Sequence, residues 1–276
     1  MRRKTIKTSV TLSGIALHSG AQAEITFKPS ASAGGIFFVR TDIAGRPRIP
    51  ATVSAVSDLT RGTSLAFGGA EVAVVEHVLA SLYALSISDI EIELSAKEPP
   101  ALDGSSVLYF NALKGAGITD LSRENLPLTL LRELVVNEGS GVAVASPSDR
   151  FLISFMIDFP GSAIGRQELS VEITERSFEG EIAQARTFGF LEEVESLKKA
   201  GLALGASEEN ALVASNDGYI NKPRFRDEAV RHKILDLIGD LCLLGRPLKA
   251  HIAVERGSHK LNAALARAIL EEAGST

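Results

Sequence analysis

The order of the expected secondary-structure elements repeats in the two halves of the chain, and this repetition limits the possible folds more than any other feature. In the first half, runs such as "TIKTSVTL" and "QAEITFKPS" alternate polar and apolar residues, which predicts short antiparallel strands. A helix in "VEHVLASLYAL", a strand in "DIEIELSA" and a helix in "SSVLYFNALKGAG" follow them. In the second half, the strand patterns "GVAVASP", "FLISFMIDFP" and "QELSVEI" precede the helix "EAVRHKILDLIGDLCLL", the strand "LKAHIAVERG" and the helix "SHKLNAALARAILEEAG".

We interpret the repetition as a diverged internal duplication, with chance recurrence of a common pattern as the alternative. It predicts an α+β fold of two similar domains, each a small mixed or antiparallel sheet packed with helices. The helix layers of the two domains are expected to face each other at an interdomain site. We place the first domain at residues 1–122 and the second at residues 123–276. The segment at about 177–216 has no counterpart in the first half, so we expect it to be an insertion that contacts substrate.

The composition excludes several classes of protein. The 276 residues carry a formal net charge of −5, which argues against a nucleic-acid-binding protein, because such proteins need a basic surface. No stretch reaches the roughly 20 apolar residues of a membrane span, and no apolar run of a signal peptide follows the basic start. The single cysteine, Cys242, cannot form an intrachain disulfide. We therefore expect a cytoplasmic monomer without stable membrane insertion.

Polar residues in the helix "EAVRHKILDLIGDLCLL" indicate either a solvated face or a site. His232, Asp236 and Asp240 are spaced four apart, so they follow one edge of the helix, with Lys233 close by. His77 has in the first half the place that His232 has in the second, so packed helices could bring both imidazoles to Asp236. Two histidines, one carboxylate and an open fourth position form a catalytic zinc site. The alternative for each histidine is an ordinary surface or core residue.

Two further side chains could transfer protons at such a site. Glu76, next to His77, could act as a general base, although a glutamate at a helix start also complements the helix dipole. His259 could be kept charged by a partner such as Asp240 and protonate a leaving amine. Alone, His259 would be a polar residue at a helix start. A metal, a base and an acid together are the parts needed to hydrolyse an amide.

Several motifs together resemble one enzyme family. They are "VVEHVLASL" at 74–82, "LDGSS" at 102–106, "ARTFGF" at 185–190, "VRHKILDLIGDL" at 230–241 and "GSHKLN" at 257–262, with "SGIALHSG" at 13–20 as a further match. The sequence resembles the UDP-3-O-acyl-N-acetylglucosamine deacetylases, zinc amidases at the first committed step of lipid A synthesis in Gram-negative bacteria. The resemblance spans nearly the whole chain, and the motifs are specific as a set although each alone is weak.

The resemblance implies a role for each matching residue. It implies Zn²⁺, which Fe²⁺ can replace in such sites, held by His77, His232 and Asp236, with Glu76 as general base and His259 as general acid supported by Asp240. It also implies that Thr187 stabilises the oxyanion, that Lys233 meets the sugar or its diphosphate, and that Phe188 packs on the substrate. His18 in "LHSG" becomes a substrate contact, although the turn chemistry of this segment would also explain it.

The implied reaction hydrolyses the N-acetyl amide of a small molecule, UDP-3-O-acyl-N-acetylglucosamine, to the free amine and acetate. The family fold has two α+β domains of similar topology, and an insertion in the second forms a passage for the acyl chain. We predict that part of the apolar residues at 177–216 lines such a groove, the alternative being that they only anchor the insertion.

Two departures from the family pattern concern substrate contacts and one concerns the metal site. "NKPRFRDE" lacks the expected Asp-Gly-hydrophobic lead-in, and the chain ends soon after its last helix, so contacts at 221–228 are in doubt. "LTRGTSL" at 59–65 has no cysteine where some relatives place one near the metal.

Two rival functions differ in chemistry from amide hydrolysis. A mononuclear iron(II) enzyme also uses two histidines and one carboxylate, but it has no evident need for Glu76 and His259. A non-catalytic module that binds a sugar nucleotide would leave the histidines and carboxylates unexplained.

Overall fold

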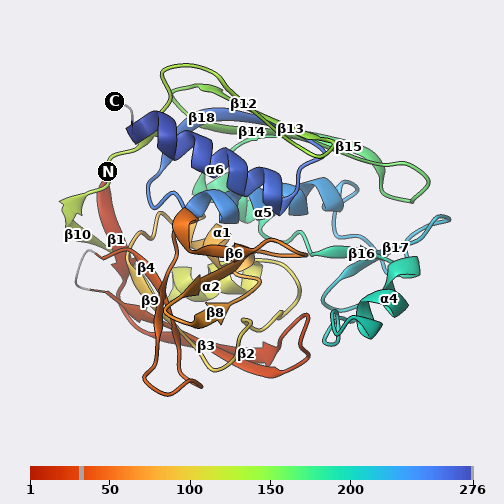
Figure 1. Ribbon diagram of the computed structural model, residues 1–276, viewed down its shortest axis with the longest axis horizontal. Helices are drawn as coiled ribbons and strands as arrows, with labels where there is room; N and C mark the ends of the chain where they lie inside the picture. Colours follow the sequence, from red (N-terminus) through yellow and green to blue (C-terminus); the bar gives the residue numbers. More distant parts are fainter. Residues whose placement is uncertain (31–33, 275–276) are drawn as a thin grey trace.

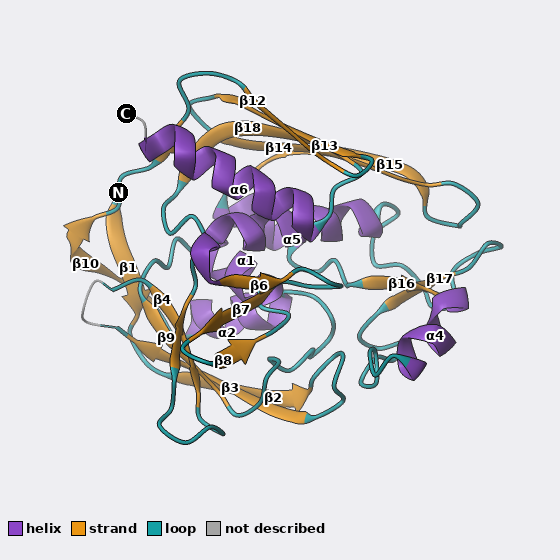
Figure 2. Ribbon diagram, viewed as in Figure 1, coloured by secondary structure: helices purple, strands orange, loops and turns teal. Residues whose placement is uncertain are grey.

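The computed structural model describes residues 1–30 and 34–274, and it confirms the predicted α+β class. Four layers are stacked: the sheet of the second half, two facing layers of helices, and the sheet of the first half (Figures 1 and 2). The helix layers meet in the middle of the molecule, as the sequence predicts. Residues of both sheets and of all the central helices belong to one apolar core.

Each half contributes one main sheet. The first, in spatial order, contains β2 (Val10–Ile15), β3 (Gln22–Pro29), β9 (Ile90–Leu94), β4 (Ile36–Arg40) and β5 (Arg48–Pro50). The second contains β12 (Leu134–Glu138), β13 (Gly141–Pro147), β18 (Leu248–Glu255), β14 (Phe151–Phe159) and β15 (Gly165–Glu172), and the short β11 (Leu128–Thr129) pairs with the start of β18. Buried and more exposed residues alternate along β3, β14 and β18, because helices cover only one face of each sheet.

The two main sheets have the same connectivity. In each sheet, the strand that comes last in the chain lies at the centre, and in the sequence it stands between two helices. This central strand, β9 or β18, runs antiparallel to β3 or β13 and parallel to β4 or β14. The shared order supports the proposed duplication. The boundary at residues 122 and 123 stays a prediction, and it lies inside β10 (Ile118–Glu124), which pairs with β1 (Arg2–Ile6).

The two helix layers contain α1 (Glu76–Ala84) and α2 (Val107–Gly115) from the first half, and α5 (Glu228–Cys242) and α6 (His259–Gly274) from the second. Helices α1 and α5 contact each other between the layers, so nearly all of their residues are buried, polar ones included. Gly239 permits this close approach, since an added Cβ would lie 2.1 Å from the carbonyl oxygen of Glu76. The polar edge of α5 is therefore not a solvated face.

Each half has additional elements between the edge strand of its main sheet and the helix of the central contact. They lie between β5 and α1 in the first half and between β15 and α5 in the second. In the first half they are the turn η1 (Val53–Ala55) and a sheet of β6 (Val56–Asp58), β7 (Ser64–Phe67) and β8 (Ala70–Val72). In the second half they are α3 (Glu175–Ser177), η2 (Phe178–Ile182), β16 (Phe188–Phe190), η3 (Leu191–Glu193), α4 (Val194–Lys199) and β17 (Leu212–Ala214). The two segments occupy the same place in the order of elements but differ in the elements that they contain. That residues 177–216 are an insertion stays a prediction.

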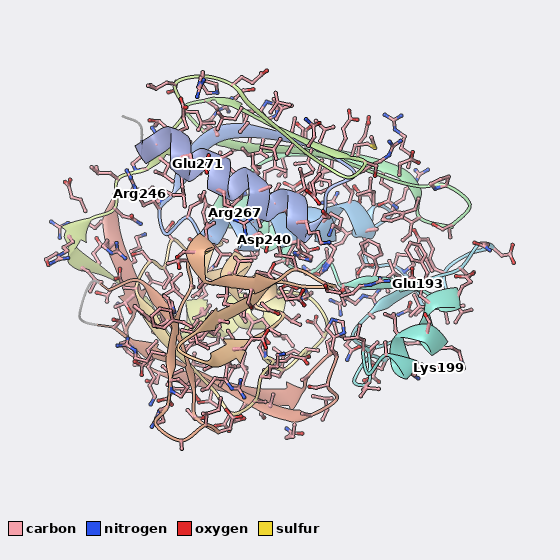
Figure 3. The ribbon with its side chains drawn as sticks, in the orientation of Figure 1. Glu193, Lys199, Asp240, Arg246, Arg267 and Glu271 are labelled. Carbon is pink, nitrogen blue, oxygen red and sulfur yellow. The ribbon has the colours of Figure 1, made fainter. Side chains whose placement is uncertain are left out.

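The insertion projects from the body of the molecule, where Glu193 and Lys199 mark it in Figure 3. It is fastened to the first half: the N–H of Leu204 donates to the carbonyl of His18 at 3.0 Å, and Arg61 forms a 2.9 Å ion pair with Glu193. The insertion therefore bridges the two halves at one end of α1 and α5. Across the described ranges 1–30 and 34–274, no helix has the length and apolar character to cross a membrane.

Candidate metal centre

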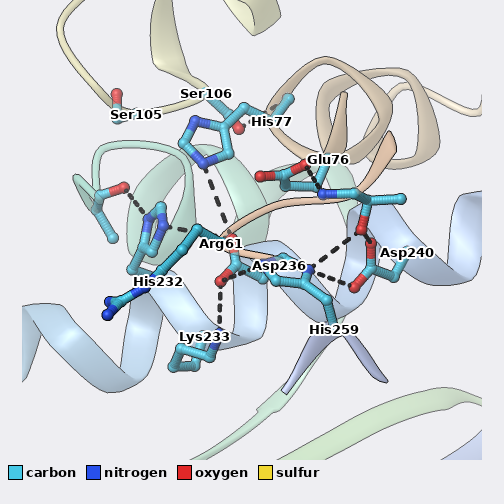
Figure 4. A network of polar contacts seen from close by, with 12 residues as sticks. Arg61, Glu76, His77, Ser105, Ser106, His232, Lys233, Asp236, Asp240 and His259 are labelled. Carbon is cyan, nitrogen blue, oxygen red and sulfur yellow. Dashed lines mark hydrogen bonds and ion pairs between the residues drawn. The ribbon is translucent and has the colours of Figure 1, made fainter. Parts of the chain in front are cut away.

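Helices α1 and α5 bring three side chains to one point (Figure 4). His77 lies in the first turn of α1, and His232 and Asp236 lie one turn apart on α5. Asp236 Oδ1 is 3.3 Å from His232 Nε2 and 3.8 Å from His77 Nε2. The two imidazole rings are nearly perpendicular, with centroids 4.9 Å apart. All three side chains are buried, so the arrangement is set by the contact between the two helices.

The spacing of the three donor atoms is close to that of the ligands of one metal ion. Zinc bonds of about 2.0–2.2 Å place neighbouring ligand atoms about 3.3–3.6 Å apart, and one donor atom from each residue lies within 4.8 Å of the others. Burial, together with a smaller effect of the neighbouring His232, lowers the pKa of His77 to about 3. Burial also lowers the pKa of His232. Both imidazoles are therefore neutral and offer lone pairs, as metal binding requires.

Contacts outside the three ligands fix how they are oriented. His232 Nδ1 lies 3.1 Å from the carbonyl oxygen of Ala185, which makes Nδ1 the donor and leaves Nε2 free for a metal. Lys233 Nζ donates to Asp236 Oδ2 at 2.8 Å, so Oδ1 is the oxygen that faces both histidines. Burial acts to raise the pKa of Asp236, but His232 and Lys233 outweigh it and hold that pKa well below its usual range.

Glu76 lies beside the three ligands and is 3% exposed. One of its carboxylate oxygens accepts a 2.9 Å hydrogen bond from the backbone N–H of Thr63. Burial raises the pKa of Glu76 to about 7, although the charge of His259 acts against this rise. Donor atoms of Glu76, Asp236 and His259 lie within 4.8 Å of one another. A carboxylate with a pKa near neutrality can take up and release a proton at the site.

His259 is the first residue of α6, and its imidazole lies next to Glu76 and Asp236. Its Nδ1 lies 2.9 Å from Asp240 Oδ2, and its Nε2 lies 3.8 Å from Asp236 Oδ2. Burial acts to lower the pKa of His259, but the charge and hydrogen bond of Asp240 raise it to about 9. The imidazole is therefore protonated at neutral pH, and its Nε2–H lies on the side of Asp236.

Two residues of the "ARTFGF" segment lie next to the ligands. Thr187 and His77 line the same small cavity. The Phe188 ring meets the His232 ring edge-on, with centroids 6.2 Å apart, and it belongs to an aromatic cluster with Phe159 and Phe190. All three phenylalanines are partly exposed, so the cluster forms an apolar surface beside the metal ligands.

The two remaining predicted substrate contacts have protein partners. The Lys233 side chain is 13% exposed, and its ammonium group pairs with Asp236. His18 Nδ1 accepts a hydrogen bond from the N–H of Ala203 at 3.3 Å, and its Nε2 lies 3.2 Å from the carbonyl oxygen of Arg61. His18 thus lies where the β2–β3 turn, the loop before β7 and the insertion meet. The substrate roles of Lys233 and His18 stay predictions.

Several residues that shape the site are not predicted from the sequence pattern. Thr63 and Asn262 both donate to Asp240, at 2.5 Å and 2.9 Å. Arg186 and Glu228 form a buried ion pair at 2.9 Å, which holds the segment that carries Ala185. Asn262 and Arg186 do lie inside the motifs "GSHKLN" and "ARTFGF", so the motifs contained them without indicating their partners.

A larger cavity lies at the other end of α1 and α5, where Tyr83, Phe151 and Cys242 are among its lining residues. The three ligand residues do not line it, and no histidine of the described chain does. Its charged lining residues include the ion-paired Arg150 and Glu172. The candidate site is therefore the polar cluster between the helices and not this cavity.

Comparison with known proteins gives one consistent result. The family model LpxC, UDP-3-O-acyl N-acetylglycosamine deacetylase, matches residues 3–271. A UDP-3-O-acyl-N-acetylglucosamine deacetylase of Thermosynechococcus vestitus is 41% identical over 271 residues, which cover 98% of this chain and 94% of the relative. Proteins of the same name from Synechocystis sp. and Myxococcus xanthus are 39% and 38% identical, over 97% and 98% of this chain and 98% and 87% of the relatives.

Proposed function

The chain belongs to the UDP-3-O-acyl-N-acetylglucosamine deacetylase family, and we propose that it uses a zinc ion to remove the acetyl group from its sugar-nucleotide substrate. The reaction is hydrolysis of the N-acetyl amide of UDP-3-O-acyl-N-acetylglucosamine to a free amine and acetate, the committed step of lipid A synthesis. One observation carries the proposal: two buried neutral histidines share Asp236 with a neighbouring pair, the carboxylate of Glu76 and the protonated imidazole of His259.

His77, His232 and Asp236 would hold the metal. When bound, the ion supplies Lewis-acid chemistry: it polarises the amide carbonyl and makes water more acidic. Three protein ligands would leave a further position for water or substrate, as a catalytic site needs and a purely structural zinc site does not. Donor atoms of Glu76 and His259 lie within 4.8 Å of Asp236. Fe²⁺ suits the same ligands, so the identity of the ion in the cell is part of the proposal.

Glu76 acts as the general base. Its carboxylate accepts a proton from water as the water oxygen forms its bond to the acetyl carbon. The pKa near 7 favours both halves of this task, because the group is partly ionised at neutral pH and basic enough to take the proton. Thr187, which lines the same small cavity as His77, would donate a hydrogen bond to the oxyanion that develops on the carbonyl oxygen.

His259 acts as the general acid. Its Nε2–H lies on the side of the metal ligands, and it protonates the amine as the carbon–nitrogen bond breaks. Asp240 keeps the imidazole charged and correctly turned through the contact at Nδ1. After these two transfers Glu76 holds a proton and His259 has lost one, so passage of one proton from Glu76 to His259 restores both groups. The second hydrogen of the water passes from the carboxyl group to the amine, so that acetate and the protonated amine leave.

Substrate binding is divided between polar and apolar surfaces. Lys233 would meet the sugar or its diphosphate with N–H groups that Asp236 does not use, and His18 would contact the substrate from the first half. Phe188 would pack on the substrate beside His232. The 3-O-acyl chain would follow the apolar residues of the insertion, of which Leu191 and Leu204 are exposed at 46% and 52%. We further propose that the enzyme works as a cytoplasmic monomer.

Measurement of bound metal and of deacetylase activity on the same preparations tests the proposal. Glu76→Gln and His259→Gln should each retain one zinc per chain and lose about a hundredfold or more in turnover, the scale of general acid–base catalysis. Asp236→Ala should lose the zinc instead.

A wild-type protein that binds zinc but does not release acetate from the UDP-linked acylated aminosugar would exclude this function. Activity that requires iron(II) and O₂ would instead favour the facial-triad alternative.

A further inference from the structure

Thr63 contacts both proton-transfer groups of the site, and it has no role in the mechanism described so far. It lies in the loop between β6 and β7 and is completely buried. Its backbone N–H donates to Glu76 at 2.9 Å. Its hydroxyl lies 2.5 Å from Asp240 Oδ1 and 3.2 Å from His259 Nδ1. One residue thus joins the carboxylate of the base with the pair that forms the acid.

The direction of each hydrogen bond follows from the number of hydrogens. A carboxylate oxygen can only accept, so the single hydroxyl hydrogen of Thr63 points to Asp240. The hydroxyl can then only accept from His259, which places a hydrogen on Nδ1. That hydrogen is shared between Asp240 Oδ2 at 2.9 Å and Thr63 Oγ1 at 3.2 Å. The imidazole is therefore fixed in rotation by two acceptors, and its Nε2 is directed toward the metal ligands.

The loop around Thr63 is shaped to reach Glu76. Gly62 has φ = +158°, and a Cβ at this position would lie 3.2 Å from a carboxylate oxygen of Glu76. Arg61 has φ = +60°, in the left-handed region that non-glycine residues rarely occupy. Backbone in this conformation persists where the surroundings hold it. The loop thus brings its backbone into contact with Glu76 and the Thr63 side chain into contact with His259.

We propose that Thr63 is a positioning residue that fixes the orientations of Glu76 and His259 for the two proton transfers. The proposal rests on the function proposed above. It assigns two separable tasks: the backbone N–H orients Glu76, and the hydroxyl orients His259 through Asp240. Side-chain substitution removes only the second task, so the base is expected to keep its hydrogen bond. Asn262, which also donates to Asp240, holds this carboxylate but does not contact the imidazole nitrogen in the same way.

The test compares Thr63→Ala, Thr63→Val and Thr63→Ser with the wild type. Serine keeps the hydroxyl, valine keeps the shape, and alanine removes the hydroxyl without adding a methyl group near Asp240. Thr5→Val is the matched control, since Thr5 is buried at 4% exposure and its hydroxyl accepts from Ser30 N–H far from the site. All variants are purified with zinc bound, and their zinc content and thermal unfolding are measured first.

We expect Thr63→Ala and Thr63→Val to keep zinc and to lose about tenfold to a hundredfold in kcat, the effect of losing one hydrogen bond to a charged group. KM should change less than about twofold, because the hydroxyl meets the acid and not the substrate. Thr63→Ser should recover most of the loss, and Thr5→Val should lose none. In spectra of protein with ¹⁵N-labelled histidine, the Nδ1 proton signal of His259 should shift in the alanine and valine variants only.

Two results would overturn the role of Thr63. One is a wild-type kcat and an unchanged His259 signal in Thr63→Ala. The other is an equal loss in the serine and alanine variants that follows their loss of thermal stability, which indicates a structural residue. The spectra need no substrate, so they judge this inference even if the wild type fails to deacetylate the UDP-sugar.

Discussion

Asp240 accepts hydrogen bonds from three side chains, His259, Thr63 and Asn262, while being only 2% exposed. A buried carboxylate is costly unless its lone pairs are satisfied, and here three donors satisfy them. This arrangement allows the negative charge to remain next to His259 and to keep the imidazole protonated. The different roles proposed for Asp236 and Asp240 follow from their positions. Oδ1 of Asp236 faces the two neutral histidines, whereas Asp240 contacts His259 at Nδ1.

At the residue scale, the rate should follow a bell in pH. Glu76 must be ionised, and burial raises its pKa to about 7, so kcat/KM falls as the pH drops through this limb. A bound dication favours the ionised form, which moves the limb below 7. His259 must be protonated, and with its pKa raised to about 9 the rate falls as the pH rises through that value.

The profile is measured as kcat/KM between about pH 5 and 10 for the wild type and for His259→Gln. The variant should lose the alkaline limb and retain the acid limb. An alkaline limb that stays in place in His259→Gln would assign the acid role to another group. The two apparent pKa values belong to the coupled site as a whole.

At the element scale, the approach of α1 and α5 creates the site. The helices approach each other closely where Gly239 meets the backbone of Glu76, and this contact influences the distance between His77 on one helix and Asp236 on the other. A larger residue at 239 would push the helices apart. The metal ligands would then separate as well, because no flexible segment lies between them and the contact.

Gly239→Ala should therefore lower both stability and metal affinity. The new methyl group would lie 2.1 Å from a carbonyl oxygen, and overpacking of this kind costs about 1–3 kcal/mol or more. Gly115→Ala is the control, because Gly115 ends α2 with open space around an added Cβ, and it should be neutral or slightly stabilising. Denaturant unfolding and zinc affinity check both. Equal behaviour of the two variants would show that the helices can separate without cost.

At the scale of the whole molecule, the two halves supply different parts of one site. The first half contributes His77, Glu76 and Thr63, and the second contributes His232, Asp236 and His259. Neither half holds all of the proposed metal ligands or both of the proposed proton-transfer groups. The insertion then joins the halves at the side where Phe188 lies next to His232.

The insertion is predicted to select the acylated substrate. Each buried methylene contributes about 0.8 kcal/mol, so a few contacts give a large preference. Leu191→Ser together with Leu204→Ser should raise KM for the acylated substrate and leave the 3-O-deacylated analogue almost unaffected. Leu131→Ser, at a position 72% exposed outside the insertion, is the control and should change neither. An equal rise for both substrates would show that the insertion only supports the fold.

The sequence by itself determined the elements and their repetition. The alternation in "FLISFMIDFP" marks a strand that one helix layer covers, and the structure has β14 there. The pattern "EAVRHKILDLIGDLCLL" marks the helix that is α5, and its spacing placed His232 and Asp236 on one edge. These features depend on periodicity within a short segment, so the chain order alone is enough to recognise them.

Only the tertiary structure decided which residues meet across the two halves. Thr63 lies 177 positions from Asp240 in the chain, and no pattern of neighbouring residues predicts their 2.5 Å hydrogen bond. The burial of the α5 edge also depends on a second helix, since the same spacing would suit a solvated face. The pKa of Glu76 is raised by burial, which is a property of all the surrounding elements together. Periodicity is local, whereas burial and electrostatic environment arise only when distant segments pack against each other.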